Sequence, residues 1–452
     1  MTVYEGVDIA FGAPYTSTPP ATYSKTLVII GCAPRSPFAG NTISALSASS
    51  PMMAYSAFGV GSLTRAYEQA FISGARSIYL VRLNRDNEVL VSDEDQSVRI
   101  SNLDTIYDRL DKIYTAIDGL PAHIILPVDV YADDPIDFAS QLAYSLYNRR
   151  DSSAIGVLGV CPRTDGVTDD QHITHLVRNS ISSNGLYITQ SGDRIDVGHK
   201  LSVVASEIRF TDQDGNICNV NGASAYAGLI ASLESNVSPT NKAMLPVAAV
   251  NNTYSGGART ETLQIDNTST QLERVPFSNL PPVVVSTSSG ATLATGIDYE
   301  IDYDSGIITG LNYIGEVTIT YEYHDLHTLT TKGYVALRHN NRRGYVPAAA
   351  ITTAHHGSQL RSLVVTRIVH EIIARINVIA DSIIGEPISK SVALENTVKH
   401  VLRDMQRAGA IVGSDYSITT DSYSGLLQLD MTIVPIGDIN QVHALCRLAI
   451  QG

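Results

Sequence analysis

A His-Glu pair in the segment Val369–Arg375, written VHEIIAR, has residue types that could hold zinc. Zinc proteases carry a second His four residues after the first, so that both imidazoles reach the metal from one helix face. Here that position is Ala374. His370 lies about 200° around the predicted helix from the apolar residue Ile368. We therefore expect His370 to be a solvated or interface side chain on the polar side of the helix, and we expect no metal site.

A run of alternating acidic residues suggests a calcium site or a pair of catalytic carboxylates. Alternate residues of a strand share one face, so these carboxylates would line up. The acidic residues are Asp298, Glu300, Asp302 and Asp304, and Tyr299, Ile301 and Tyr303 alternate with them. A calcium loop needs a longer array ending in a bidentate Glu, and acid–base catalysis needs two carboxylates in different environments. We therefore expect a solvated face of a hairpin.

The segment Gly59–Thr64 matches half of a dinucleotide-binding loop. Such a loop uses a third glycine for close packing between helix and strand, and Thr64 stands in its place. The chain contains neither the Gly-x-Ser-x-Gly elbow of hydrolases nor a Walker A sequence. We therefore expect this segment to begin a helix, and we expect a protein that is not an enzyme and has no catalytic residue, cofactor or metal.

Composition and charge are typical of a large globular protein. Of the 452 residues, 44% are hydrophobic and 17% are charged. The 31 basic and 45 acidic residues give a net charge of −14, which disfavours direct binding to nucleic acid. No apolar run reaches the roughly 18 residues that cross a bilayer, and no signal peptide is recognisable. We expect synthesis in a cytoplasm, no membrane insertion, and free thiols at the four widely spaced cysteines.

One basic pattern differs from this acidic background. Lys399, Arg403 and Arg407 recur every fourth residue in a predicted helix and form a stripe beside its apolar face. The stripe could be an ordinary solvated surface. It could also dock onto an acidic partner through complementary charge.

Strand and helix patterns alternate through the first half of the chain. The predicted strands are Thr26–Gly31, Ser77–Leu83, His123–Val130, Ala154–Val160 and Gly185–Gln190, and the predicted helices are Leu63–Ile72, Ile106–Ile113, 137–148 and His172–Ile181. Apolar strands that alternate with helices indicate buried strands joined by crossovers. This order predicts an α/β (α+β) core with a mixed sheet.

The pattern changes twice further along the chain. Between about Asn251 and Tyr323 the helical periodicity is lost and hairpin patterns take over. From Ser358 two amphipathic helices follow, and an alternating strand lies close to the end of the chain. We therefore divide the chain into an extended N-terminal arm (1–25), a discontinuous core (26–250 and 326–425), a β-rich insertion domain (251–325) and a C-terminal strand arm (426–452).

The order of these parts resembles the tail sheath proteins of contractile phage tails and related injection machines. Four blocks carry the resemblance: TLVIIGCAPRSP, AFGVGSLTRAYEQAFISGARSIYLVRL, ASAYAGLIASLESNVSPTNKAM and GYVALRHNNRRGYVPAAAITTA. They resemble the first core strand, a helix leading to a strand that ends in Arg, a helix leading to a Pro/Asn turn, and the strands before the C-terminal helices.

The resemblance implies a structural subunit that polymerises as stacked hexameric rings around an inner tail tube and contracts to drive the tube through the host envelope. It implies that the helix with the basic stripe faces the tube. It also implies arms that add strands to neighbouring subunits. The arm residues would be Val3, Tyr4, Val7 and Ile9 at the N-terminus and Leu427, Leu429, Met431 and Ile433 at the C-terminus.

The implied partners are further copies of the chain, the inner tail tube protein, and baseplate and tail terminator proteins. The implied location is the tail of a virion assembled in the host cytoplasm. An alternative is another self-assembling virion component, such as a baseplate, tube or fibre protein. We expect the insertion domain to lie on the outer surface, and we expect deletion of 426–452 to leave a folded core that no longer polymerises.

Overall fold

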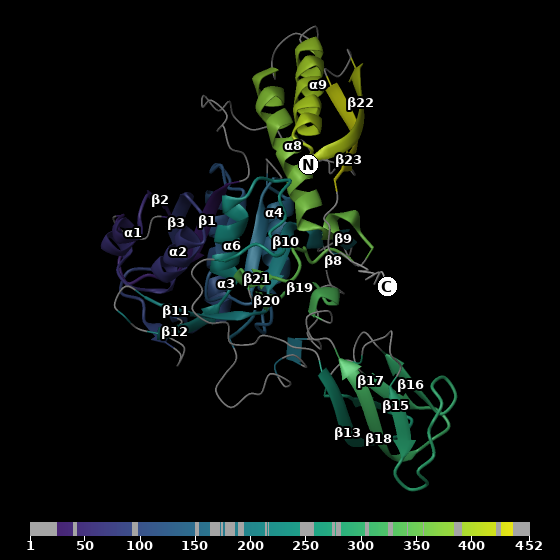
Figure 1. The fold of residues 1–452 in the computed structure, drawn as a ribbon. Helices are drawn as coiled ribbons and strands as arrows, with labels where there is room; N and C mark the ends of the chain where they lie inside the picture. The colour runs from purple at the N-terminus through teal and green to yellow at the C-terminus, as the bar shows by residue number, and fades with distance from the viewer. Residues whose placement is uncertain are drawn as a thin grey trace, which may run out of the picture.

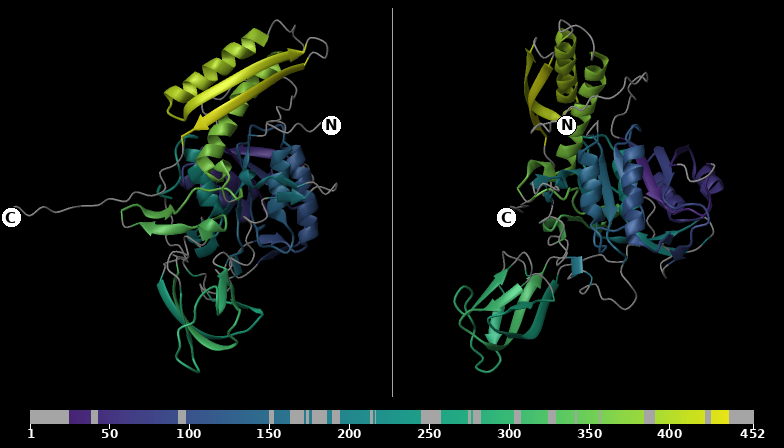
Figure 2. Two further views of the ribbon diagram at one scale, coloured as in Figure 1. Left: turned by 90° about the vertical axis from the view of Figure 1, so that its right-hand side faces the viewer. Right: turned by 180° about the vertical axis from the view of Figure 1, so that it is seen from behind.

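The computed structural model places most of the chain in three parts. The described residues are 25–38, 43–92, 98–149, 153–162, 172, 175–176, 186–188, 194–212, 215, 217–244, 257–273, 276, 282–302, 307–323, 329–340, 342–355, 357–383, 391–421 and 426–436. Figure 1 shows a central core, a unit of helices and a hairpin at one end, and a β-rich unit at the opposite end. The turned views in Figure 2 also place the two end units on opposite sides of the core.

A seven-stranded sheet forms the centre of the core, in the order β19-β10-β7-β6-β1-β3-β2. The strands are β1 (Thr26–Gly31), β2 (Ala45–Ala48), β3 (Ser77–Arg82), β6 (Ile124–Pro127), β7 (Ile155–Gly159), β10 (Leu201–Val204) and β19 (Tyr334–Val335). Neighbouring strands are parallel except β2 and β3, which are antiparallel. The apolar run of β1 fits its central position, since a parallel strand is buried on both faces.

Helices cover both faces of this sheet. They are α1 (Pro51–Phe58), α2 (Ser62–Ile72), α3 (Leu103–Ala116), α4 (Phe138–Tyr147) and α6 (Ala223–Ser232). Leu27 and Ile29 of β1 pack with α1, α2 and α6, whereas Val28 and Ile30 pack with α3 and α4. Alternate residues of a strand point to opposite faces, so the core has three layers with an apolar cluster on each side of the sheet.

Short polar residues fix where several of these helices begin. The side chain of Asn102 accepts hydrogen bonds from the first amides of α3, and Asp137 accepts one from Ser140 in α4. Ser50 does the same for α1, where Pro51 occupies the first helical position. Such caps satisfy amides that have no partner within the helix.

Small antiparallel hairpins surround the core sheet. Their strands are β4 (Leu90–Ser92) with β5 (Val98–Ile100), β8 (Leu186–Ile188) with β9 (Arg194–Asp196), β11 (Glu207–Thr211) with β12 (Ile217–Asn221), and β20 (Leu337–Asn340) with β21 (Gly344–Pro347). The predicted strand Gly185–Gln190 is confirmed as β8, but β8 pairs with β9 outside the core sheet. Of the predicted helix His172–Ile181, only His172, His175 and Leu176 are described, and all three are helical.

The described residues of the segment predicted as an insertion form six strands with an apolar core of their own. They are β13 (Gly257–Ile265), β14 (Ser269–Gln271), β15 (Val283–Ser286), β16 (Tyr299–Asp302), β17 (Ile307–Gly310) and β18 (Gly315–Tyr323). They form two sheets, β13-β18-β15 and β14-β17-β16, which enclose an apolar cluster that includes Val284, Tyr299 and Val317. Glu300 and Asp302 are exposed as predicted, while Asp304 lies outside the described residues. Asp298 differs from the prediction: it is half-buried in a turn before β16, and its carboxylate accepts a hydrogen bond from the amide of Ala294 at 2.8 Å.

At the other end of the molecule, two helices pack against a hairpin. These elements are α8 (Leu363–Ile383), α9 (Ser391–Arg407), β22 (Ile411–Asp421) and β23 (Leu426–Pro435). The apolar stripes predicted for both helices meet in one cluster, which includes Ile368 and Ile372 of α8 and Val398 and Leu402 of α9. We call α9, β22 and β23 the distal unit, and α8 connects it to the core.

Candidate functional site

Helix α8 joins the core to the distal unit through two chemically different faces. Its apolar face packs on α9 and on half-buried residues of the hairpin. The residues of α8 in this contact are Val364, Ile368, Ile372, Ile376 and Ala380. The other face contacts the core and carries the polar residues Arg367, His370 and Glu371, which are at most 6% exposed. The helix therefore has no broad solvent face over this stretch.

Arg367 attaches α8 to the C-terminal end of α6. Its guanidinium donates hydrogen bonds to the carbonyl oxygens of Ile230 (3.2 Å), Leu233 (2.7 Å) and Glu234 (3.1 Å). The last carbonyls of a helix have no partner inside it, so the arginine caps α6. Burial lowers the pKa of Arg367 to about 10. The side chain therefore stays charged at neutral pH.

Glu371, one turn further along α8, contacts the same region of the core. The hydroxyl of Ser235 donates a hydrogen bond to its carboxylate, and Arg375 of α8 forms an ion pair with it. Together with Arg367, this contact holds the first half of α8 against the end of α6.

His370 is buried, so the prediction of a solvated or interface side chain was wrong. It is 4% exposed, and its Nε2 lies 2.9 Å from Nζ of Lys200, which is 2% exposed. Thr366 and Asn377, on the same polar side of α8, are buried as well. The helical period places His370 correctly away from the apolar stripe. The same period does not show that this side of the helix faces a polar surface of the core and not solvent.

The basic stripe of α9 is exposed along its length. Lys399, Arg403 and Arg407 point away from the apolar cluster that α9 shares with α8. Arg407 lies 3.8 Å from Asp404, which also contacts His400 at 3.0 Å. Lys399 and Arg403 form no ion pair with any described residue. The stripe thus presents two uncompensated positive charges on a chain of net charge −14.

The predicted C-terminal arm strand is β23, and it pairs with β22 of the same chain. Leu429 lies opposite Ile418, and Met431 lies opposite Tyr416. Leu429, Met431 and Ile433 are half-buried against the α8–α9 cluster, while Asp430 and Thr432 are exposed. The side chain of Leu427 lies outside the described residues, although its backbone is part of β23. The sheet has two strands, so each strand has an outer edge without a partner in the described chain.

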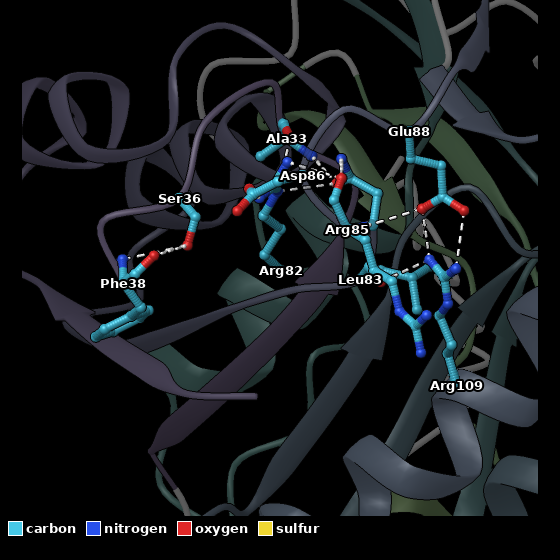
Figure 3. A network of polar contacts seen from close by, with 10 residues as sticks. Ala33, Ser36, Phe38, Arg82, Leu83, Arg85, Asp86, Glu88 and Arg109 are labelled. Atoms are coloured by element: carbon cyan, nitrogen blue, oxygen red, sulfur yellow. Dashed lines mark hydrogen bonds and ion pairs between the residues drawn. The ribbon is translucent and has the colours of Figure 1, made fainter. Parts of the chain in front are cut away.

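A network of polar contacts braces the loop that follows β3, as Figure 3 shows. Arg109 of α3 binds Glu88 through two hydrogen bonds of 2.5 and 2.8 Å. This contact lowers the pKa of Glu88. Arg82 donates to the carbonyl oxygen of Ala33 (3.0 Å) and forms an ion pair with Asp86 (2.5 Å). These contacts fix the loop to α3 and to the end of β3, which in turn contacts Ala33 in the segment after β1.

A small cavity lies between the carboxyl ends of β6 and β7 and the first turns of α2 and α6. Open α/β sheets often bind ligands outside the carboxyl ends of their strands, at the point where the strand order reverses. Here the order reverses between β1 and β6, one strand away from the cavity. The cavity has a volume of about 50 Å³, which is room for a few water molecules. Arg65 in its wall is held by Asp212 at 3.0 Å, and Asp129 in its floor has a left-handed backbone with φ of 61°.

The glycine-rich segment Gly59–Thr64 begins a helix, as predicted, since α2 starts at Ser62. Pro34 packs against it, and a β-carbon at Gly59 would lie 2.8 Å from the Pro34 side chain. Thr64, in the position of the third glycine, accepts a hydrogen bond from the amide of Gly61 at 3.0 Å. The threonine therefore has a capping role at this helix start.

Several sequence predictions concern residues outside the described ranges. Val3, Tyr4, Val7 and Ile9 of the predicted N-terminal arm belong to these, as does the chain after Ile436. Cys32 is buried and Cys161 half-buried, and neither forms a disulfide within the described ranges. In the described ranges, no three His, Cys, Asp or Glu side chains could hold one metal ion. No helix in those ranges is both long and apolar enough to cross a bilayer.

The sequence reasoning missed the polar contacts between α8 and the core. Arg367 and Glu371 are spaced by four residues, with His370 between them. These polar residues form a second stripe along the helix, which could have indicated that this face contacts another part of the protein. Nothing in the sequence pairs Lys200 with His370, because 170 residues separate them.

Comparison with protein-family models and with curated protein sequences gives no match. Solved structures do match. A chain of the baseplate of the anti-feeding prophage is 11% identical, has a TM-score of 0.57, and matches over 100% of both chains. The helical sheath of the anti-feeding prophage in its contracted state is 11% identical, with a TM-score of 0.53 over 99% of this chain and 98% of that chain. A sheath tail protein of Listeria innocua is 10% identical, with a TM-score of 0.53 over 93% of each chain.

These likenesses extend over the core, the inserted strands and the distal unit together, since they cover nearly the whole chain. At such low identity they establish the fold. The chain has the fold of the tail sheath proteins of contractile injection systems, which is the resemblance that its sequence indicated.

Proposed function

We propose that this chain is the structural subunit of a contractile tail sheath. It would polymerise as stacked hexameric rings around an inner tail tube and contract to drive that tube through a host envelope. The observation that carries this proposal is the fold, which matches sheath chains over nearly the full length. Its place would be the tail of a virion or a related extracellular particle, assembled in the host cytoplasm.

The exposed stripe of α9 supports a contact between the distal unit and the tube. Lys399 and Arg403 present positive charge that no described residue compensates. Charges of this kind favour an acidic partner surface and set the register of docking. We therefore assign the tube-facing role to the side of α9 that carries Lys399, Arg403 and Arg407.

The opposite placement of the two end units supports an outward position for the inserted strands. The distal unit and the sheets of β13–β18 lie on opposite sides of the core in every view (Figures 1 and 2). If α9 faces the tube, the inserted strands point away from it. They would then lie on the outer surface of the sheath, where added mass does not obstruct the tube.

The hairpin β22–β23 supports assembly by strand addition. Its two outer edges expose backbone groups that can pair with further strands. An extended N-terminal arm and the chain after Ile436 could supply such strands from neighbouring subunits. The links would keep subunits connected while their cores change packing during contraction.

A second candidate is a related component of the same kind of particle. The baseplate chain of the anti-feeding prophage matches over 100% of both chains with a TM-score of 0.57. A baseplate subunit would form one ring and would not extend into a cylinder. Baseplate and tail terminator proteins would be neighbours of a sheath and not copies of it.

Expression of the chain alone, followed by negative-stain electron microscopy, tests the proposal. A sheath subunit should form hollow, helically striated cylinders, and a baseplate subunit should form single rings. Uniform compact particles at every concentration would contradict both. Coexpression with a candidate tube protein then tests the tube contact. The Lys399→Glu/Arg403→Glu variant should lose tube binding, whereas the exposed-lysine control Lys112→Glu on α3 should retain it.

A further inference from the structure

The two faces of α8 differ in how easily they can separate. The contact with the distal unit is apolar and includes Ile368, Ile372 and Ile376. The contact with the core includes the apolar residue Leu363 at the start of the helix, followed by Arg367, His370 and Glu371, which are charged or titratable. A change in protonation can weaken the second contact without directly affecting the first. If the polar contact opens, α8 should therefore stay with the distal unit.

The pair of His370 and Lys200 is the titratable centre of this contact. Nζ of Lys200 lies 2.9 Å from Nε2 of His370, and both side chains are buried. A lysine ammonium has only donors, so Nε2 of His370 must accept the hydrogen bond. That arrangement requires a neutral imidazole. Protonation of His370 would remove the acceptor and place two positive charges in contact.

The groups around this pair come from several elements of the core and from α8. The half-buried His199 stands edge-on to His370, with ring centroids 6.5 Å apart, and Tyr147 of α4 stands edge-on to His199 at 6.4 Å. His123, at the start of β6, adds a further basic group whose charge also disfavours protonation of His370. On α8 itself, Arg367 and Glu371 point to the end of α6 and are engaged there.

On balance these surroundings oppose protonation of both histidines, although backbone contacts with Ser153 for His370 and with Asp196 for His199 have the opposite, smaller effect. Burial holds the pKa of His370 well below its usual value, and Lys200 and then His199 add to the effect. Burial and Lys200 lower the pKa of His199 to about 3. In the unfolded chain both imidazoles return to an ordinary pKa near 6.5. Acid therefore favours any state in which this contact is open.

We propose that the contact of His370 with Lys200 is an acid-sensitive latch between α8 and the core. When it is closed, α8 and the distal unit are fixed to the core. Uptake of a proton by His370 opens it, and α8 moves together with the distal unit. The latch is a property of the single chain, so it goes beyond the sheath proposal and does not depend on it.

The direction of the effect follows from linkage. A histidine whose pKa is lower in the closed state than in the open state stabilises the closed state fully above about pH 6.5. That stabilisation is lost as the pH falls from about 6.5 towards the pKa of the closed state. When opening is coupled to the uptake of one proton, the ratio of open to closed latch rises about tenfold for each unit by which the pH falls in this window.

Hydrogen–deuterium exchange of the full-length chain, read out by mass spectrometry, tests the latch. Protection of the peptide 363–376 is compared at pH 7.5, 5.5 and 4.5, after correction for the intrinsic pH dependence of exchange. We expect protection of this peptide to fall at least tenfold more than that of β1 and β6 between pH 7.5 and 4.5. Loss of protection at the same rate throughout the chain would overturn the proposal.

Three variants make the assignment specific. His370→Gln keeps an acceptor for Lys200 but cannot be protonated, so it should reduce the extra loss of protection at low pH to the part that His199 contributes. His175→Gln removes an exposed histidine elsewhere and should behave as the wild type. Unchanged pH dependence in His370→Gln would contradict the latch. Should His370→Gln fail to fold, Lys200→Met removes the repelling charge and should shift the opening to lower pH; no shift would overturn the proposal.

Discussion

Gly228 of α6 lies directly against the backbone of Ala70 in α2. A β-carbon at Gly228 would be 2.3 Å from the carbonyl oxygen of Ala70 and 2.7 Å from its Cα. The two helices therefore approach closely at this point, on the face of the sheet that carries Leu27 and Ile29. A glycine inside a helix costs stability relative to alanine, so this glycine is explained by packing.

Replacement of Gly228 by Ala should therefore destabilise the chain. The gain in helix propensity is about 1 kcal/mol, but overpacking of a rigid contact costs roughly 1–3 kcal/mol. We expect a net loss in the free energy of unfolding, measured by urea denaturation. Gly413→Ala is the control, because the nearest atoms to its β-carbon are 3.9 Å away. A Gly228→Ala variant as stable as the wild type would show that α2 and α6 can separate at low cost.

Arg367 gives a second test, because three of its bonds satisfy carbonyls at the end of α6. Arg367→Met keeps much of the volume but leaves these buried acceptors unpaired. The expected cost is about 2–4 kcal/mol in the free energy of unfolding. Arg367→Lys should recover only part of it, because an ammonium cannot reach several carbonyls in one plane. Arg375→Met, at a more exposed ion pair, should cost less than about 1 kcal/mol.

The fold was predictable from the sequence where the periodicity of apolar residues alone shows which side chains are buried. The β-branched run Thr26–Gly31 predicts a strand buried on both faces, and β1 occupies that position in the sheet. The apolar stripes of α8 and α9 predict a helix pair, and both stripes meet in one cluster. In these elements the apolar residues carry the signal, because burial in an apolar core leaves a regular pattern.

The predictions were incomplete where a polar residue contacts another part of the protein. A helical period separates apolar from polar positions, but it does not separate solvent from a polar protein surface. His370 was therefore expected to be solvated, although Lys200 and the core bury it. The pairing of β8 with β9 was missed for a related reason: a short apolar strand does not specify its partner.

Stability should depend on pH through Glu88. The hydrogen bond from Arg109 holds the pKa of this carboxyl below its ordinary value of 4.5. A lowered pKa contributes stability that is present above the unfolded value and is lost as the pH falls through the folded value. The stability difference between wild type and Glu88→Gln should shrink as the pH falls below about 4.5. Urea denaturation at each pH measures it.

Asp86→Asn is the control for removal of a neighbouring carboxylate charge, since Asp86 is 45% exposed in its ion pair with Arg82. A Glu88→Gln difference that stays constant from pH 6 to 3 would contradict a lowered pKa at Glu88.

The C-terminal arm is better tested by a shorter deletion than removal of 426–452. That deletion removes β23, which pairs with β22 and covers the α8–α9 cluster with Leu429, Met431 and Ile433. It should therefore destabilise the distal unit as well as prevent assembly. Deletion of 437–452 keeps β23. We expect it to leave the melting temperature unchanged and to abolish cylinders in electron micrographs; cylinders of normal length would contradict an assembly role for this segment.

The inserted strands should be removable without loss of the core. Gly257 of β13 pairs with Tyr323 of β18, so the ends of the segment lie only about 5 Å apart and a short Gly-Ser linker can replace 257–323. In the part of the chain that the structure describes, the apolar cluster of this segment contains no residue of the core or of the distal unit. The core and the distal unit should therefore melt at the same temperature in the shortened chain as in the full-length chain, as measured by calorimetry.

The same deletion tests where the inserted strands lie in an assembly. If they point outward, the shortened chain should still form cylinders, with a smaller outer diameter and an unchanged inner diameter. Val317→Ser in the full-length chain is the control, because it should loosen only the cluster of β13–β18 and leave assembly intact. A shortened chain that folds but forms no cylinders would place the inserted strands in contacts between subunits. A changed inner diameter would place them against the tube.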